Sequence, residues 1–210
     1  MAHSGDKALR ISKIEHFDEG ELIQRLREVS MLEDETAFPY RDSRIELREM
    51  PHGELHPAQR YVLSGNVKRL EDLRWSLGDM GFELFKPDGF FRLWFRGSDA
   101  PVDLLPPIVE ESRHDGGGRP INIICDGMHR VYLSYVQWVI PQIVYIRGVP
   151  NEYPYYAYPL RDSNWSDIEI WDSIPTGAIK KWHRIRADKK LYRNFNSAFE
   201  NVGAPRGSGK

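Results

Sequence analysis

Residues 121–137 read INIICDGMHRVYLSYVQ, and the order of residue types in this stretch decides the fold. The run INIIC at its start is mostly apolar, which is typical of a strand buried on both faces. Asp126 and Gly127 end that strand, and helical spacing follows over residues 128–138. A second buried strand is predicted over residues 140–146. Strand, turn, helix and strand in this order predict an α/β domain in which the turn opens a helix.

The turn DGMHR, from Asp126 to Arg130, combines residue types that suit a phosphate group. A helix start offers free backbone N–H groups and a partial positive charge, and Gly127 lets an anion approach the backbone closely. His129 and Arg130 lie in the first helical turn, where the forked guanidinium suits phosphate. Asp126 would cap the helix or coordinate a Mg²⁺ ion. The same residues also fit an ordinary helix start with surface side chains.

Hydrophobic periodicity predicts further elements on the N-terminal side of the turn. These are an amphipathic helix over residues 13–32, a half-buried strand over 44–50, a helix over 67–80, and a β-hairpin with strands 82–85 and 90–95. We expect Ser64 or Asn66 to cap the second helix and Gly81 to end it.

The charge of the chain is small but unevenly distributed. The 210 residues carry a formal net charge of −2. From Lys180 to Lys210, nine Lys and Arg oppose two acidic residues, which gives this tail +7 and leaves −9 on the rest. Cys125 is the only cysteine, and the first residues hold no apolar segment of a signal peptide. No apolar stretch has the length of a membrane span. We therefore expect a cytoplasmic protein without membrane contact.

The order of motifs around the turn resembles the ParB/sulfiredoxin superfamily. The motifs are PPIV (residues 106–109), a glycine-rich turn, INIICDGMHRVYLSYVQ (121–137) and IPQIVYI (140–146). The resemblance is good over residues 102–149, and it extends back over 44–80 if these form the first strand and helix of the family. It implies an α/β (α+β) fold with a small mixed sheet and flanking helices.

The resemblance also suggests how the chain is divided. Residues 1–43 would form an N-terminal helix and a connector, residues 44–160 the ParB/sulfiredoxin-like domain, and residues 161–210 an aromatic and basic extension of helical character.

One position departs from sulfiredoxin itself. The catalytic cysteine of sulfiredoxin lies between the glycine and the histidine of the turn, where this chain has Met128. A thioether cannot supply the thiolate that this chemistry requires. Cys125, three residues earlier, ends a buried strand and is expected to be a small core residue. We therefore expect no sulfinic-acid reductase activity.

The Asp-Gly-x-His-Arg form of the turn is similar to two kinds of superfamily member, which are nucleotide-dependent small-molecule kinases and proteins associated with DNA. The kinase resemblance implies a phosphotransferase that holds ATP or another nucleotide, with Mg²⁺, and acts on an acceptor that the sequence does not identify. The nucleotide phosphates would contact Gly127, Met128, His129 and Arg130, and Asp126 would be the metal ligand.

Phosphoryl transfer also needs a group that accepts the proton of the acceptor hydroxyl. Asp126 and His129 would be catalytic, and a separate carboxylate would act as the base. The candidates are Glu46 and Glu49 at the predicted strand 44–50, and Glu110 and Glu111 after PPIV, with Glu49 and Glu110 preferred. Each would otherwise be an ordinary surface carboxylate.

The C-terminal part offers a second interpretation of function. The basic segment between Lys180 and Arg193 contains interleaved aromatic residues, a composition that suits nucleic-acid contact. It equally suits a helix with an apolar stripe and a solvated basic face. The aromatic run between Tyr153 and Tyr158 would stack on a base or cover a sheet edge. The alternative to a phosphotransferase is therefore a ParB-like, nucleic-acid-associated regulatory module that nucleotide binding switches.

Overall fold

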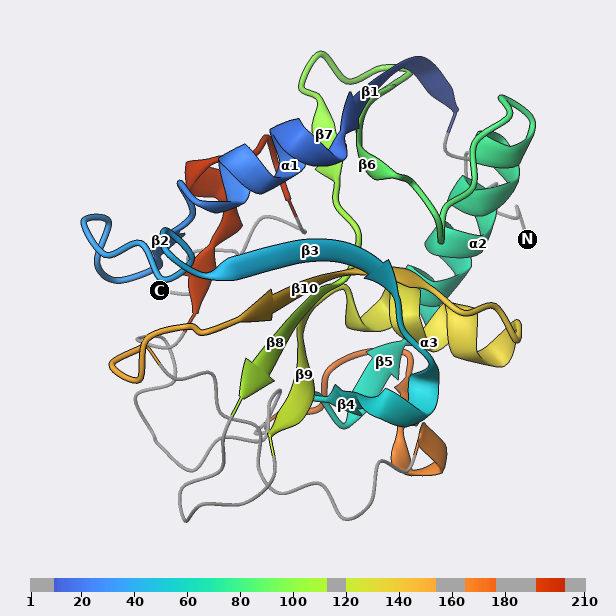
Figure 1. Cartoon of the computed structure of the whole chain (residues 1–210). Coiled ribbons are helices and arrows are strands. Elements are labelled where there is room, and N and C mark those ends of the chain that lie inside the picture. The colour runs from blue at the N-terminus through green and yellow to red at the C-terminus, as the bar shows by residue number, and fades with distance from the viewer. Residues whose placement is uncertain (1–9, 113–119, 154–164, 177–191, 203–210) are drawn as a thin grey trace.

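A mixed five-stranded sheet forms the centre of the protein. The computed structural model describes residues 10–112, 120–153, 165–176 and 192–202. The sheet has the strand order β3-β10-β8-β9-β4 (Figure 1). Its strands are β3 (Arg44–Glu49), β4 (Leu55–Pro57), β8 (Ile108–Ser112), β9 (Ile121–Asp126) and β10 (Gln142–Arg147). The strands predicted over residues 44–50, 121–125 and 140–146 are confirmed.

The pairing of these strands makes the sheet mixed. Strand β10 runs antiparallel to β3 and parallel to β8. Strand β9 runs antiparallel to β8 and parallel to β4. Strands β8, β9 and β10 have a neighbouring strand on each side, and their central residues are buried in the clusters on the two faces, which explains the apolar runs in β9 and β10. The predicted small mixed α+β sheet is therefore confirmed.

Helices cover the two faces of this sheet (Figure 1). Helix α1 (Glu19–Leu26) packs Leu22 and Leu26 on the face that carries Ile108 and Val144. Helix α3 (Met128–Val136) packs Val131 on the opposite face. Successive side chains of a strand alternate between the faces, so one strand supplies both cores. None of the helices in the described part of the chain has the length and apolar character needed to cross a membrane.

A second sheet of three strands lies beside the first. Its order is β1-β6-β7, with β1 (Ile11–Asp18), β6 (Gly89–Phe95) and β7 (Val102–Leu104). Helix α2 (Ser64–Gly78) supplies Leu73 and Leu77 to the core under this sheet, together with Leu133 of α3. Helix α2 thus links the small sheet to the helix that follows the turn.

The helix predicted over residues 13–32 is wrong in its first half. Residues Ile11–Asp18 form strand β1, and α1 begins only at Glu19, after Asp18 has capped it. Phe17 stacks on Phe90 of β6 with ring centroids 4.6 Å apart. Gly89 permits this close pairing, because a Cβ atom there would lie 1.9 Å from the Phe17 carbonyl oxygen. Pairing with a distant strand has overridden a helical pattern.

The hairpin predicted over residues 82–95 is also wrong. Strand β6 pairs with β1 and β7, and residues 82–85 form no strand. The Phe82 amide instead donates to the Leu77 carbonyl and closes the end of α2, while Gly81 adopts a φ of 82°. Helix α2 itself ends at Gly78, earlier than predicted, and Gly81 lies in the turn that follows it. Neither Ser64 nor Asn66 is its cap, since the cap position falls on Leu63 and no side chain bonds there.

The described residues of the C-terminal extension form short strands and 3₁₀ turns where we expected helices. Strand β11 (Glu169–Trp171) pairs with β5 (Tyr61–Leu63), and β12 (Arg193–Asn194) pairs with β2 (Ser30–Met31). Within the described residues, the 3₁₀ turns are His52–Glu54, Trp165–Asp167 and Phe195–Ser197. The predicted basic helix up to residue 191 and the aromatic run after Tyr153 lie outside the described residues.

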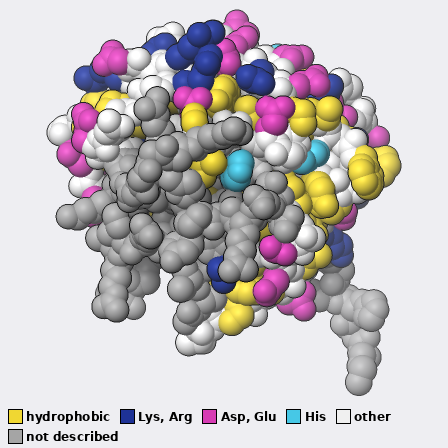
Figure 2. Space-filling model, turned by 60° about the horizontal axis from the view of Figure 1, so that its bottom comes forward, with side chains coloured by type: hydrophobic (Ala, Val, Ile, Leu, Met, Phe, Trp, Pro, Cys, Tyr) yellow, Lys and Arg dark blue, Asp and Glu magenta, His cyan; other side chains and the backbone are white. Residues whose placement is uncertain are grey.

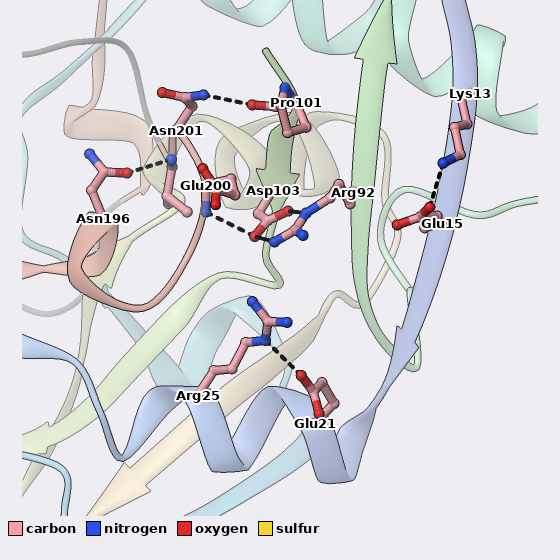
Figure 3. A network of polar contacts seen from close by, with 11 residues as sticks. Lys13, Glu15, Glu21, Arg25, Arg92, Pro101, Asp103, Asn196, Glu200 and Asn201 are labelled. Carbon is pink, nitrogen blue, oxygen red and sulfur yellow. Dashed lines mark hydrogen bonds and ion pairs between the residues drawn. The ribbon is translucent and has the colours of Figure 1, made fainter. Parts of the chain in front are cut away.

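Two buried carboxylates fasten the C-terminal segment to the body of the protein. Glu110 receives two hydrogen bonds of 2.9 Å from Arg193 and one from the Tyr40 hydroxyl. The Asp103 carboxylate accepts hydrogen bonds from the Arg92 guanidinium at 2.7 and 2.8 Å and from the Glu200 amide at 2.9 Å (Figure 3). Residues 192–202 are therefore part of the fold, held by ion pairs as well as by the packing of Phe195 and Phe199.

Candidate functional site

The turn between β9 and α3, residues 126–130, is built around Gly127, and we call it the glycine turn. Gly127 has φ 82° and ψ 18°, a left-handed conformation that costs other residues about 1–2 kcal/mol. A Cβ atom at this position would lie 2.8 Å from Pro107 Cα and 2.8 Å from Arg130 Nη2. The Gly127 carbonyl accepts the Arg130 and Val131 amides at 2.9 and 3.0 Å. Only glycine fits here, and the helix starts directly after it.

Asp126 does not cap α3, contrary to one of the two roles predicted for it. The cap position belongs to Gly127, and no side chain bonds to the first amides of the helix. The Asp126 carboxylate instead accepts a hydrogen bond of 3.1 Å from Arg130 Nη2. This contact holds the Arg130 side chain against the turn, so the Asp126 carboxylate does not occupy the start of α3.

Arg130 is more enclosed than a surface arginine. Burial lowers the pKa of its guanidinium below the usual value, and the Asp126 charge opposes that shift. Its Nε atom is buried and has no hydrogen-bond partner among the described residues. A guanidinium with an unused donor has capacity for a further acceptor. Arg130 therefore places a guanidinium, paired with Asp126, next to the helix start.

His129 connects α3 to the start of α2. Its Nε2 accepts the Leu63 amide at 3.0 Å, and Asn66 Nδ2 lies 3.5 Å from the same atom. A backbone N–H only donates, so Nε2 carries the lone pair and, in the neutral ring, the proton resides on Nδ1. His129 cannot donate a proton through Nε2 in this arrangement. The imidazole acts as an acceptor that positions α2.

Two helix N-termini therefore meet at His129. Helix α2 begins at Ser64, directly after the Leu63 amide, and α3 begins at Met128. Each helix start carries about half a positive charge and unsatisfied amide donors. The Ser64 hydroxyl donates to the Asp172 carboxylate at 2.7 Å, so β11 and the residues after it border the same region. The combination of two helix starts with Arg130 suits a group with several negative charges.

Aromatic side chains border the start of α2. Tyr61 stacks on Trp171 with ring centroids 4.1 Å apart and an interplanar angle of 13°. The Tyr61 hydroxyl is buried without a hydrogen-bond partner in the described part of the chain. Trp165 stacks on Tyr135 and donates through its indole N–H to the His52 carbonyl. Histidine and hydrophobic side chains reach the surface together on the face shown in Figure 2.

The remaining predicted site residues lie apart from the glycine turn or in the core. Met128, the first residue of α3, is buried in the core between this helix and the sheet. Glu49 at the end of β3 is engaged by Lys86 Nζ at 2.7 Å. Glu110, two residues beyond Ile108, points to the α1 face and is buried against Arg193 and Tyr40. These contacts favour structural roles for Glu49 and Glu110 over the predicted role of a base.

The metal role of Asp126 stays a prediction. No group of three or more His, Cys, Asp or Glu side chains in the described ranges is arranged to hold a metal ion. Asp126 is bound to Arg130, so an ion brought by a nucleotide would be held chiefly by phosphate oxygens.

The residues at the start of α2 were not predicted as site residues. Leu63 is 66 positions from His129 in the sequence, and no local pattern joins them. In the sequence, this second part of the site was indicated only by Ser64 and Asn66, which predicted a helix start and therefore a further set of amide donors.

A mixed sheet that leads through a glycine turn into a helix start, with a second helix start beside it, defines an α+β protein with a candidate anion site at the turn. A family model described as the ParB CE domain matches residues 21–169. The chain belongs to the ParB CE domain family. The matched range includes the whole five-stranded sheet, α2, α3 and the glycine turn, and it extends beyond the expected domain of residues 44–160 on both sides. Comparison with curated proteins and with solved structures gives no match.

Proposed function

We propose that the glycine turn and the start of α2 bind the phosphate groups of a nucleotide, and that the protein is a nucleic-acid-associated regulatory module of ParB type. The observation that carries this proposal is the meeting of two helix starts at His129, next to Arg130, inside the region that matches the ParB CE domain. Phosphate is stabilised at helix starts by free amides and by the helix dipole. ATP or another nucleotide, with Mg²⁺, is the ligand class that fits.

Bound phosphate would act as a bridge between two helices. Among the described residues, His129 Nε2 joins the two helix starts through its contacts with Leu63 and Asn66. A ligand that bonds to both starts favours the arrangement in which they are close, and such differential binding shifts a conformational equilibrium. Helix α2 also packs under the small sheet, so a shift of α2 would reach β6 and β7.

Binding is favoured over phosphoryl transfer because of the carboxylates. Asp126 is paired with Arg130, Glu49 with Lys86, and Glu110 with Arg193. A base for an acceptor hydroxyl needs a free carboxylate within hydrogen-bond reach of the substrate. Phosphotransfer is therefore the weaker candidate, and measurement of nucleotide turnover with and without hydroxyl acceptors separates the two.

The first prediction concerns Arg130. Titration calorimetry with ATP, GTP, CTP and UTP, each with Mg²⁺, is expected to show binding of at least one nucleotide. Arg130→Gln is expected to weaken that binding roughly 10- to 100-fold, because a charge-assisted hydrogen bond contributes about 1.5–3 kcal/mol. Arg130→Lys keeps the charge but not the forked guanidinium, so its nucleotide affinity should lie between those of the wild type and Arg130→Gln. Arg96→Gln, at the exposed residue that follows β6, is the matched control and should bind as the wild type does. Absence of binding of any nucleotide or of inorganic phosphate at millimolar concentration contradicts the proposal.

The second prediction concerns the contact between the helices. His129→Ala is expected to lower the free energy of unfolding by about 1–3 kcal/mol, because the Leu63 amide loses its acceptor. His129→Gln supplies an amide oxygen in a similar place and should recover part of that loss. Urea denaturation measures both. Equal midpoints for the wild type and His129→Ala would show that this contact does not hold α2 to α3.

A further inference from the structure

Three arginines lie on one face of the two strands at the edge of the central sheet. Arg44 and Arg48 belong to β3, and Arg147 belongs to β10. Arg44 and Arg147 are paired in register, and Glu46 pairs with Tyr145 between the arginines. Side chains two residues apart on a strand share a face, so all five side chains lie on the same side of the sheet. We call Arg44, Arg48 and Arg147 the arginine row.

Glu46 forms ion pairs with all three arginines of the arginine row. Glu46 lies 3.5 Å from Arg44, 3.8 Å from Arg48 and 3.5 Å from Arg147. These distances exceed the roughly 2.7–2.9 Å of a strong charge-assisted hydrogen bond. Glu46 balances one of the three guanidinium charges and Glu111 contacts the Tyr145 hydroxyl on the same face, which leaves an excess of one positive charge. The arginine row is therefore held in place without being neutralised.

Tyr145 orders the arginine row and adds no negative charge to it. Arg48 and Arg147 lie over its ring at 5.3 and 5.4 Å from the centroid. Its hydroxyl lies 3.1 Å from Glu111 Oε2 and 3.0 Å from Asn122 Oδ1. Burial, followed by the Glu111 charge, raises the pKa of Tyr145 to about 12, so the phenol stays neutral at physiological pH. The guanidinium groups are thus pre-positioned on an aromatic surface.

The arginine row is accessible. The exposed fractions of its side chains are 71% for Arg44, 42% for Arg48 and 34% for Arg147. Strand β3 is at the edge of the sheet, three strand positions from β9, roughly 14 Å at the usual strand spacing. The row is therefore separate from the glycine turn at the end of β9.

We propose that the arginine row contacts the phosphate backbone of duplex DNA. This inference rests on the nucleic-acid association in the proposed function and assigns a surface to it. Arg44 and Arg48 are four residues apart on β3, which is roughly 13 Å at the usual rise per residue. Duplex DNA presents a phosphate about every 3.4 Å along each strand, so such a spacing spans several phosphates. Contacts of this kind position a protein on DNA without selecting a base sequence.

The test is fluorescence anisotropy with a labelled duplex over a series of salt concentrations, using the full chain. Arg44→Gln combined with Arg48→Gln is expected to weaken binding roughly tenfold and to reduce the slope of log K against log salt by about 2. The loss should be the same for duplexes of unrelated sequence. Arg147 is retained, because its Nε is buried and its removal would disturb the sheet. The matched control is Arg10→Gln combined with Arg96→Gln, which removes the same charge from exposed positions next to β1 and β6, away from the central sheet.

The outcomes separate this inference from the proposed function. If the wild type binds DNA and the β3 variant matches the control variant in affinity and slope, the arginine row is not the contact, while the nucleic-acid association stands. If the wild type binds no duplex even at low salt, the association itself is wrong and the inference fails with it. Nucleotide calorimetry on the β3 variant should give the wild-type value, which shows that the sheet and the glycine turn are intact.

Discussion

Gly127→Ala is expected to lower the free energy of unfolding by about 2–5 kcal/mol and to abolish nucleotide binding. The left-handed backbone costs an alanine about 1–2 kcal/mol, and overpacking against a fixed neighbour adds about 1–3 kcal/mol. The neighbour is the Pro107 backbone, 2.8 Å from the new Cβ atom, which cannot rotate away as a side-chain tip would. Any relief moves the start of α3, and the free amides move with it. Urea denaturation and nucleotide calorimetry measure the two effects.

Two other glycines separate the sources of this loss. Gly148 has a φ of 74° but nothing within 4 Å of its Cβ position. The loss of stability in Gly148→Ala therefore measures the cost of the left-handed backbone alone. Gly53 has neither a positive φ nor a neighbour within 4 Å, and Gly53→Ala should be close to neutral. The expected order of destabilisation is Gly127, then Gly148, then Gly53. A loss at Gly127 no larger than that at Gly148 would show that Pro107 does not restrict the glycine turn.

Arg193→Met is expected to destabilise the protein by about 3–5 kcal/mol, because it leaves a buried carboxylate without its cation. Both partners are almost inaccessible, with exposed side-chain fractions of 1% for Arg193 and 2% for Glu110. Burial acts to lower the pKa of Arg193, but the Glu110 charge outweighs it and holds that pKa above the usual value. Burial, followed by the Glu110 charge, likewise raises the pKa of Tyr40, so its hydroxyl stays a donor to Glu110. The free energy of unfolding in urea gives the size of the loss.

The double variant Glu110→Gln/Arg193→Met tests the reason for that loss. Removal of both charges should restore most of the stability, since the cost comes from the unpaired charge rather than from a missing contact. Arg25→Met is the matched control at a solvent-accessible pair, Arg25–Glu21, where about 0.2–1 kcal/mol is expected. Equal losses for Arg193→Met and Arg25→Met would mean that the C-terminal segment is not fastened at Glu110.

The buried position of Arg193 also affects the prediction from the sequence that the basic segment contacts a nucleic acid. Arg193 was counted with the basic segment that begins at Lys180 and was expected to face a nucleic acid. Its side chain is instead used inside the protein, where it bonds to Glu110 and to the Tyr153 carbonyl. Composition records the number of charges in a segment but not the direction in which each points. Among the described residues, the arginine row lies instead on β3 and β10, where the sequence analysis had considered only the carboxylates Glu46 and Glu49 as functional candidates.

Local patterns predicted those parts of the fold that depend on neighbouring residues. The apolar run of β9, the break at Gly127 and the spacing of α3 are consequences of backbone preference and side-chain period, and all are present in the structure. Strand β1 and the partners of β6 were predicted wrongly. Their pairing joins residues more than 70 positions apart, and tertiary contacts of that kind outweigh local propensity.

By itself, the sequence determined that a glycine turn opens a helix behind a buried strand, because only glycine tolerates that backbone and because the apolar period is local. The tertiary structure alone decided what surrounds the turn. It joined His129 to Leu63 and Arg193 to Glu110, residues 66 and 83 positions apart. The geometry of a hydrogen bond or an ion pair depends on the path of the whole chain between its partners, and no local pattern carries that information. For this reason the glycine turn was predictable, whereas its second helix start and the burial of Glu110 were not.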